Sequence, residues 1–405
     1  MLNQISTELI KEASMYTYVR AGLFNMLDPP KQNIVILRGA RGIGKSTLLL
    51  QYLSEQQYRG HKVLYVSADS AIIPDTLAKL AYDFYFSGGE YLAIDEIHKY
   101  IGWQPEAKTI IDSFPKLKVL VSGSSSLNLD YAAADLSRRH IMLQAKGLSF
   151  REFLNKNYLT QFRAYDLVEI LTNAEDLAVD IMQQLRIHKI DLIELFHLYL
   201  QEGYFITRDK YKSEGIYYSS LINTINSVID SDLPSVYHDL DNLSIQKIKL
   251  LLKHVAQKCP FTPNIKELSS HLGIAKDNTL KKYLQYLHDG EVLLNLYPVN
   301  KSHKDFLKPQ KIFLNNSNYA YAFGNNPEIG TIRETFVANC LNGLGDLTAP
   351  TYGDFCLDNN WTFEVGGKTK TKKQIKDINN SYVLADDILW ANKDIIPLWL
   401  LGFLW

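Results

Sequence analysis

The chain has 405 residues, of which 46% are hydrophobic and 12% aromatic. At about 150 residues per domain, this length predicts two to three domains, each with enough apolar residues to bury a core. The formal net charge is −1. The sequence has three cysteines, Cys259, Cys340 and Cys356. They lack CxxC or any other metal-ligand spacing, which excludes a cysteine-based metal module. We expect them to be buried or incidental thiols in a reducing compartment.

Neither end of the sequence predicts a targeting or membrane segment. Residues Met1–Ser6 contain no basic region leading into a long apolar stretch, so we expect no signal peptide. The longest late apolar run, Ile395–Trp405, contains Pro397 and is far shorter than the roughly 20 residues that span a bilayer. We interpret this run as a core strand and expect a cytoplasmic protein with no membrane partner.

The first 154 residues predict an α/β domain. An amphipathic helix is expected over Glu8–Met26, ending at Asp28–Pro30. Apolar strand patterns then alternate with helical stretches, which is typical of a parallel sheet covered on both faces. The expected strands are 33–38, 62–67, 91–95, 117–122 and 140–144.

The segment Gly39–Ser46 contains the complete phosphate-binding pattern GxxxxGK[ST]. It follows the apolar run Ile34–Leu37 and precedes a helix-forming run, which is the strand–loop–helix context that this loop requires. Lys45 is expected to reach the β- and γ-phosphates of ATP, and the Ser46 hydroxyl to bind Mg²⁺. Arg41 is a second candidate for sensing phosphate charge. The expected nucleotide-binding residues are Gly39, Ala40, Arg41, Gly42, Ile43, Gly44, Lys45, Ser46 and Thr47.

Two adjacent carboxylates close the apolar strand Tyr91–Glu96. In a P-loop ATPase the first, Asp95, holds Mg²⁺ and the second, Glu96, polarises the attacking water. The alternative is a strand end capped by solvated acids. The phosphate-binding pattern upstream favours the ATPase interpretation.

Further residues downstream complete the expected nucleotide site. A buried-strand pattern ends at Ser122 and Ser124, either of which can hydrogen-bond the attacking water or the γ-phosphate. Arg138 and Arg139 follow, just before the last strand. One of them is a candidate arginine finger, in cis or toward a neighbouring subunit, and a surface arginine pair is the alternative.

The first 154 residues resemble the AAA-type ATPases of the AAA_14 family, which are commonly joined to a DUF4143-like C-terminal region. The resemblance rests on the motifs above and on Asp95–His98, Trp103, Phe114–Ser126 and Leu148–Phe153. The family pattern has Gly-Arg before the last strand, whereas this chain has Arg138-Arg139, so the glycine is missing and Arg139 takes the arginine position.

The resemblance continues downstream through Arg333–Phe336, Phe363–Lys368 and Pro397–Trp399, and it is absent from roughly residues 155–245. It implies ATP binding and a link to DNA, without a known substrate.

Residues 155–244 are expected to form a helical connector or lid. The segment is acidic: residues 160–244 contain 14 Asp and Glu against 6 Lys and Arg. Apolar side chains at i, i+3, i+4 and i+7 predict a buried helical face formed by Leu192, Leu195, Phe196 and Tyr199.

Residues 245–324 predict a winged helix. Helices are expected at Ile245–Gln257, Ile265–Leu272 and Asn278–His288, followed by strand patterns at Val292–Tyr297 and Lys311–Leu314. Residues 245–311 contain 12 Lys against 5 acids, which favours contact with a polyanion. Contact with a protein is the alternative. If the third helix enters a DNA groove, its exposed face is formed by Asn278, Lys281, Lys282 and Gln285.

Residues 325–405 contain Glu334, Asp354 and Glu364 in the order of a restriction-endonuclease-like core, and these carboxylates are a possible second metal site. Such enzymes carry Glu-x-Lys, whereas here Lys368 follows Glu364 by four positions. Side chains alternate along a strand, so Lys368 stays on the same face but roughly 13 Å away unless the two intervening glycines bulge. We therefore expect this fold with weak or absent cleavage.

The sequence as a whole predicts an Mg²⁺-dependent ATPase whose winged helix and nuclease-like domain engage DNA. Two alternatives remain: an ATP-dependent nuclease cutting through the three carboxylates, and a nucleotide-gated binding protein with little turnover. A homo-oligomer or a protein partner is also compatible with the sequence.

Overall fold

A computed structural model gives the structure of the protein and describes residues 2–28, 34–69, 73, 75–123, 140–187, 191–298, 308–324 and 327–405. The chain divides into two compact units. Unit 1 comprises residues 1–146 and 230–240, and unit 2 comprises residues 147–229 and 241–405. This grouping is coarser than the four expected segments 1–154, 155–244, 245–324 and 325–405. None of the described helices is long and apolar enough to cross a membrane.

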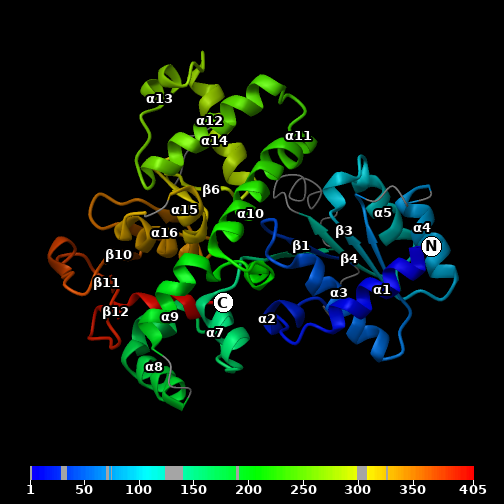
Figure 1. Ribbon diagram of the computed structural model, residues 1–405, viewed down its shortest axis with the longest axis horizontal. Coiled ribbons are helices and arrows are strands. Elements are labelled where there is room, and N and C mark those ends of the chain that lie inside the picture. The colour runs from blue at the N-terminus through cyan, green and yellow to red at the C-terminus, as the bar shows by residue number, and fades with distance from the viewer. Residues whose placement is uncertain are drawn as a thin grey trace. The chain divides into compact units, whose positions relative to one another are not determined.

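Unit 1 contains a five-stranded parallel sheet with the strand order β2-β3-β4-β1-β5 (Figure 1). The predicted strands agree with the structure to within one residue at each end. Because β4 lies between β1 and β3, its carboxyl end separates the ends of those two strands. The strands are β1 (Ile34–Arg38), β2 (Val63–Ser67), β3 (Tyr91–Asp95), β4 (Lys118–Gly123) and β5 (His140–Gln144).

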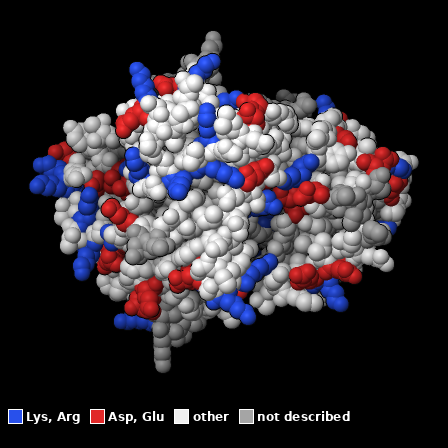
Figure 2. Space-filling view, turned by 45° about the horizontal axis from the view of Figure 1, so that its top comes forward, with Lys and Arg blue, Asp and Glu red and all other residues white. Residues whose placement is uncertain are grey.

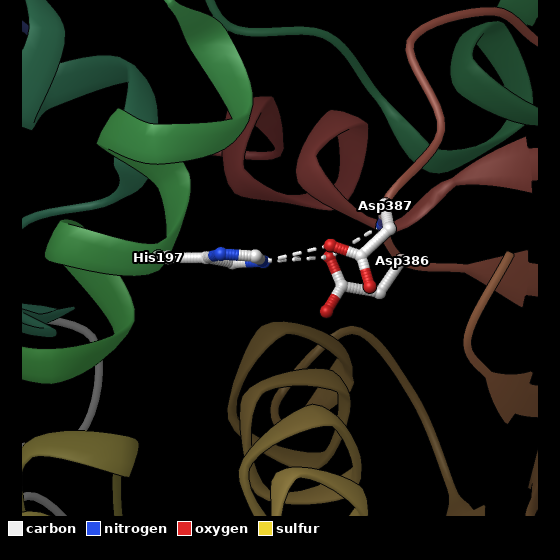
Figure 3. Close-up of side chains that lie close together, drawn as sticks. All are labelled: His197, Asp386 and Asp387. Carbon is white, nitrogen blue, oxygen red and sulfur yellow. Dashed lines mark hydrogen bonds and ion pairs between the residues drawn. The ribbon is translucent and has the colours of Figure 1, made fainter.

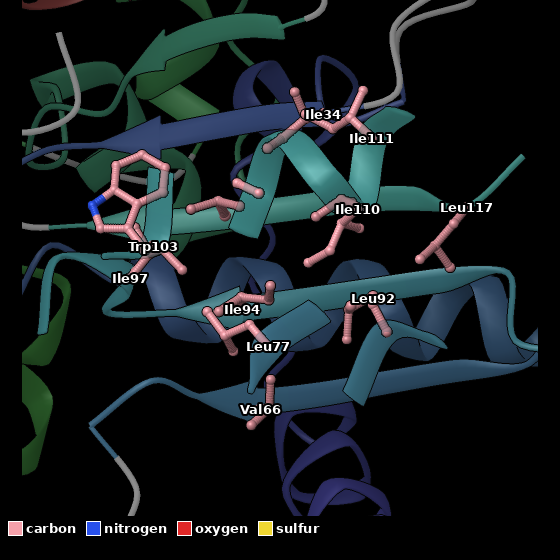
Figure 4. Packing of buried hydrophobic residues seen from close by; sticks show 14 of the residues in the cluster. Ile34, Val66, Leu77, Leu92, Ile94, Ile97, Trp103, Ile110, Ile111 and Leu117 are labelled. Carbon is pink, nitrogen blue, oxygen red and sulfur yellow. The ribbon is translucent and has the colours of Figure 1, made fainter. Parts of the chain in front are cut away.

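Helices cover both faces of this sheet. Helices α4 (Leu77–Phe86) and α5 (Trp103–Ser113) bury their apolar faces against alternate strand residues such as Ile94 (Figure 4). Helices α1 (Leu2–Ser14) and α3 (Lys45–Tyr58) contact the sheet through β2. Strands β1 to β4 are therefore largely buried on both faces, which explains their continuous apolar sequence, whereas the edge strand β5 is mostly half-buried.

The single helix expected over Glu8–Met26 is wrong. The structure has α1, which ends at Ser14, and a short α2 (Ala21–Phe24). The intervening aromatic and β-branched residues have low helix propensity. The backbone of this segment makes a hydrogen bond outside any helix: the Tyr18 carbonyl accepts from Gln51 Nε2 at 3.0 Å.

Residues 230–240 return to unit 1 and include the short helix α11 (Leu233–Val236). They follow α10 (Glu214–Ser227) and begin within a π-helical turn, η4 (Val228–Asp232). This segment lies inside the expected connector 155–244, and it places Asp232 beside the 3₁₀ turn η1 (Ile97–Lys99) that follows β3.

Unit 2 begins with helices, as the sequence predicts. The buried face of Leu192, Phe196 and Tyr199 is confirmed, and Leu195 is half-buried. The helical elements of this part are α7 (Phe150–Tyr158), α8 (Leu167–Ile187), α9 (Leu192–Leu198), the π-helical η2 (Tyr199–Gly203), η3 (Ile206–Lys210) and α10.

Three further helices are followed by two antiparallel strands, close to the expected positions. The strand register pairs Leu293 with Leu314. Residues 299–307 between the strands lie outside the described residues. These elements are α12 (Asn242–Lys258), α13 (Ile265–His271), α14 (Asp277–Asp289), β6 (Leu293–Leu296) and β7 (Lys311–Leu314).

The last part of unit 2 is a five-stranded mixed sheet with the order β12-β11-β10-β9-β8. Strands β10, β11 and β12 are parallel, whereas β8 and β9 are antiparallel to their neighbours. Helix α16 packs on β10. The elements are α15 (Ser317–Phe323), α16 (Ile329–Leu341), β8 (Leu347–Thr348), β9 (Phe355–Leu357), β10 (Trp361–Gly366), η5 (Lys372–Gln374), β11 (Ser381–Ala385) and β12 (Ile395–Pro397).

The C-terminal apolar run is only partly a strand, which corrects the expectation for Ile395–Trp405. It forms β12 and then a buried 3₁₀ helix, η6 (Leu398–Phe403), that contacts α7, α8 and α16. A side chain on Gly402 would clash with Phe150, so the helices approach closely there. The run therefore forms part of the shared core of unit 2.

Candidate functional site

The glycine loop after β1 has the backbone conformation that the phosphate-binding pattern requires. Gly42 and Gly44 have φ of +86° and +93°, a region that favours glycine. A Cβ on Gly39 would clash with the Ala145 carbonyl oxygen. Gly44 precedes α3 and has no side chain to cap it, so the first N–H groups of this helix remain available to an anion.

Lys45 is buried in this loop, with its side chain folded against the loop backbone. Its Nζ donates to the carbonyl oxygens of Gly39 at 2.7 Å and Ala40 at 2.9 Å. Only 6% of the residue is exposed. The loop carbonyls thus hold the ammonium at the carboxyl edge of the parallel sheet, where ligands of open α/β sheets bind.

Asp95 is buried at the end of β3 and has its carboxylate fixed by three donors. Tyr65 donates to Oδ2 at 2.6 Å, the Ser122 hydroxyl donates to Oδ1, and the Glu96 backbone N–H donates to Oδ1 at 3.1 Å. Ser122 is fully buried. Ser122 therefore contacts Asp95, and its expected contact with the attacking water or the γ-phosphate stays a prediction.

Tyr65, on β2, is a site residue that the sequence reasoning missed. Burial, followed by the Asp95 carboxylate, raises the pKa of Tyr65, while a hydrogen bond with Ser46 opposes this shift. The phenol therefore stays protonated and contacts both residues expected to bind Mg²⁺. A tyrosine inside an apolar strand has no local signal that separates it from a core residue, because its partners are 19 and 30 positions away.

Glu96 has a strained backbone with φ of +53°. Its Oε2 atom is buried, makes no hydrogen bond to any described residue, and lies 3.5 Å from His98 Nε2. The left-handed turn directly after the strand turns the Glu96 side chain out of the strand alternation, so Asp95 and Glu96 need not point to opposite faces.

The Asp232 side chain forms ion pairs with residues of the glycine loop and of the turn after β3. Its Oδ1 lies 2.9 Å from Lys99 Nζ, 3.5 Å from Arg41 Nη1 and 3.9 Å from His98 Nε2. Burial alone would raise the pKa of Asp232, but hydrogen bonds from His98 and Lys99 lower it to about 2. Arg41 is thus bound to an acidic residue from far along the chain, a contact that no local pattern predicts.

The geometry of the first unit fits an Mg²⁺-nucleotide. Asp95 ends β3 and Ser46 lies in the first turn of α3, directly after the glycine loop. Both residues contact Tyr65. Hydroxyl and carboxylate oxygens are the ligands that Mg²⁺ prefers. Three of the residues expected in this site, Ser124, Arg138 and Arg139, lie outside the described residues.

The three C-terminal carboxylates each contact a different donor. Glu334 Oε2 pairs with Lys311 at 2.5 Å, Asp354 Oδ2 accepts from the Val365 N–H at 2.7 Å, and Glu364 pairs with Lys370. Burial raises the pKa of Glu334, Lys311 opposes this, and the charges of Asp354 and Glu364 raise it further. The three acids therefore lie in one electrostatic neighbourhood.

Lys370, not Lys368, reaches Glu364. Strand β10 ends at Gly366, and the chain then turns so that the Lys370 N–H donates to the Gly367 carbonyl. A Cβ on Gly366 would clash with the Lys370 side chain, which occupies that space. Lys368 is exposed. The expected position of Lys368 assumed that side chains keep alternating as in a strand, but the strand ends before Lys368 and the chain turns.

The residues expected on the DNA-facing side of α14 differ in their surroundings. Asn278 is exposed, and Lys281 and Lys282 are half-buried. The Gln285 side chain is hydrogen-bonded within the protein: it donates to Asp289 at 2.8 Å and accepts from Tyr297 at 2.7 Å. On the face drawn in Figure 2, Lys and Arg are interspersed with Asp and Glu.

Residues 31–154 match the model of the AAA_14 family, which is described as an AAA domain. This match and the glycine-loop geometry support an AAA-type P-loop ATPase domain, and with it nucleotide binding. The match does not extend to the C-terminal region, so its DUF4143-like character stays a prediction. A sequence search of curated proteins gives no match.

Solved structures give weak similarities. The replication initiator DnaA bound to AMPPCP and single-stranded DNA is 14% identical over 71% of this chain and 89% of that chain, with a TM-score of 0.29. AMPPCP-bound DnaA from Aquifex aeolicus is 16% identical over 71% and 88%, also with a TM-score of 0.29. A structure on katanin self-assembly is 16% identical over 39% and 57%, with a TM-score of 0.24. These scores are too low to carry an argument about fold or function.

Proposed function

We propose that the protein is an Mg²⁺-dependent ATPase of the AAA type that couples its nucleotide state to DNA binding. The observation that carries the ATPase part is the buried Asp95 carboxylate, held by Tyr65 and Ser122 beside the glycine loop. These hydrogen bonds hold the carboxylate in one orientation, and carboxylate and hydroxyl oxygens are ligands that Mg²⁺ prefers. The positions of Asp95 and Ser46 support a cation site next to bound phosphates.

In this proposal, the loop N–H groups and Lys45 bind the phosphates, and Ser46 and Asp95 would hold Mg²⁺. The bound cation would neutralise charge that develops on the phosphate oxygens. Glu96 orients the attacking water and accepts its proton, and its buried Oε2 supports that role. Arg139 remains the proposed arginine finger, with Ser124 as a candidate contact to the γ-phosphate.

The coupling part rests on Asp232 and on the three-helix segment. Asp232 contacts Arg41 of the glycine loop, and a bound γ-phosphate would compete for the same guanidinium. Residues 242–314 have the element order of a winged helix, which supports DNA as a partner through Asn278, Lys281 and Lys282. A protein partner or a homo-oligomer contact is the alternative use of this surface.

A second candidate function is metal-dependent DNA cleavage by the C-terminal domain. It is supported by the common neighbourhood of Glu334, Asp354 and Glu364 and by Lys370, which supplies the expected lysine from a different position. However, among the described residues, the oxygens of these three acids do not gather within 4.8 Å of one another. This separation supports the proposal that the C-terminal domain binds rather than cleaves efficiently.

Two substitutions test the ATPase proposal. Lys45→Ala removes the loop ammonium and is expected to weaken ATP binding sharply in calorimetry. Glu96→Gln keeps the shape of the side chain and is expected to retain ATP binding while losing phosphate release. Lys108→Ala, which changes an exposed lysine on α5, is the control. Equal turnover in Glu96→Gln and the parent would exclude the role of Glu96, and ATP binding without turnover in the parent would favour the nucleotide-gated binding protein.

A further inference from the structure

A histidine and two adjacent aspartates meet in unit 2, and none of them is among the three carboxylates considered above. His197 lies in the last turn of α9, and Asp386 and Asp387 directly follow β11. One ligand atom from each of the three residues lies within 4.8 Å of the other two. Figure 3 shows the His197 ring directed at the two carboxylates.

Local structure explains why these side chains converge. Asp191 caps α9 by accepting from the N–H groups of Ile193 and Glu194, which fixes the start of the helix and hence the position of His197. Neighbouring residues of a strand point to opposite faces. Asp387 escapes this alternation because it has φ of +61°, immediately after the β10–β11 ladder ends.

The distances match a metal-binding geometry better than a hydrogen bond. His197 Nε2 lies 3.2 Å from Asp387 Oδ1 and 3.4 Å from Asp386 Oδ1. Hydrogen bonds between charged N–H and carboxylate groups are shorter, about 2.7–2.9 Å. Ligands at about 2.0–2.1 Å from a tetrahedral Zn²⁺ are separated by roughly 3.3 Å.

Arg333, on α16, holds the other oxygen of each carboxylate. Its Nε donates to Asp386 Oδ2 at 2.8 Å, and its Nη2 donates to Asp387 Oδ2 at 3.0 Å. The two Oδ1 atoms face His197, and Asp386 Oδ1 also accepts from the Asp387 N–H at 2.9 Å. With neutral imidazole, the four groups carry a net charge of about −1. Carboxylates that bind a metal typically have their other oxygen hydrogen-bonded, as these are to Arg333.

We propose that His197, Asp386 and Asp387 bind a divalent transition-metal ion, with Zn²⁺ as the best fit, and that Arg333 orients the two carboxylates. One imidazole and two carboxylates form a ligand set that suits such ions. Asp386 is buried, whereas the side chains of His197 and Asp387 are 41% and 37% exposed. The His197 Nε2 atom itself is buried and makes no hydrogen bond to any described residue. The ion would link α9 to the end of β11.

The competing interpretation is an ion-pair cluster without metal. In that state, hydrogen bonding to Asp386 raises the pKa of His197 and favours the imidazolium. The two interpretations differ in one measurable respect: the metal site binds Zn²⁺ through His197, and the ion-pair cluster does not.

The test is calorimetric titration of the metal-depleted full chain with ZnCl₂ in excess Mg²⁺. Mg²⁺ competes for carboxylate-only sites but poorly for imidazole. We expect one Zn²⁺ per chain and at least about tenfold weaker binding in His197→Gln and in Asp387→Asn. The second variant is included in case His197→Gln does not fold. Asp387 is exposed, so its substitution is expected to leave the fold intact. Thermal unfolding of each variant checks that it is folded.

His254→Gln is the matched control, because the rings of His254 and His271 lie 5.1 Å apart and offer a competing imidazole pair. Zn²⁺ affinity unchanged in this control supports the proposed site. Absence of Zn²⁺ binding by the parent, equal affinity in His197→Gln and the parent, or loss of binding in His254→Gln would each overturn it.

Discussion

Lys99 Nζ lies 2.9 Å from Asp232 Oδ1, which joins the turn after the Asp95 strand to a segment more than 130 residues downstream. Both side chains are largely buried, with 14% and 4% of their surface exposed. A buried ion pair of this kind is sensitive to the loss of either partner.

We expect Asp232 to make the stability of unit 1 depend on pH. Its pKa is lowered from 3.8 to about 2 in the folded state, so its contribution of about 2 kcal/mol is complete above about pH 4 and is lost as the pH falls through about 2. Urea unfolding of the parent and of Asp232→Asn at several pH values measures this. The difference between the two should shrink across that window, and Asp69→Asn, an exposed acid, should show no such trend. A pH-independent difference would contradict the expectation.

Tyr65→Phe removes the donor to Asp95 Oδ2 without changing the shape of the ring. If Tyr65 orients the carboxylate, the variant should need about 10-fold more Mg²⁺ for half-maximal ATP turnover, while ATP binding without Mg²⁺ stays unchanged. Phosphate release over an Mg²⁺ titration measures the effect. Tyr85→Phe, on α4, is the control. An identical Mg²⁺ requirement in both variants would show that the Tyr65 hydroxyl is structural only.

If α14 contacts DNA phosphates, replacing Lys281 and Lys282 with Gln should reduce the slope of log K against log salt by about 2. Fluorescence anisotropy at several salt concentrations measures the slope. The paired replacement of Lys108 and Lys116, which are exposed in unit 1, removes the same charge elsewhere and should leave the slope unchanged. Salt-independent binding, or none, would favour a protein partner for the three-helix segment.

Any Mg²⁺-dependent nicking by the C-terminal domain should require Glu364 and Lys370. Lys370→Gln should reduce it by about 100-fold, because the lysine paired with Glu364 is the one able to support an attacking water. Lys368→Gln is the matched control, since its side chain is exposed. Conversion of supercoiled plasmid to the nicked form is the measurement. Loss of nicking in Lys368→Gln alone would show that the observed pairing is not the functional one.

The parts of the fold and site that the sequence predicted are those with local signals. The five strands of unit 1 each consist of a short apolar run between polar turns, and the glycine loop is a continuous pattern next to one of them. Asp95 and Glu96 were found because they directly end such a strand.

The parts that could not be predicted depend on contacts between distant residues. Tyr65 and Asp232 reach the site from other elements, and neither has a sequence neighbour that marks it. Gln285 fits an exposed helical face by periodicity, yet its amide bonds to Asp289 and Tyr297. Lys370 was missed because the chain turns after Gly366, where strand alternation no longer holds.

The division of the chain into 1–146 with 230–240, and 147–229 with 241–405, means that the backbone passes between the units three times. A single proteolytic cut between residues 146 and 147 would not release unit 1 intact, because the second fragment still carries Asp232 and its contacts to Arg41 and Lys99. The two fragments are thus expected to co-purify. A recombinant ATPase domain ending near residue 154 would lack part of its own fold.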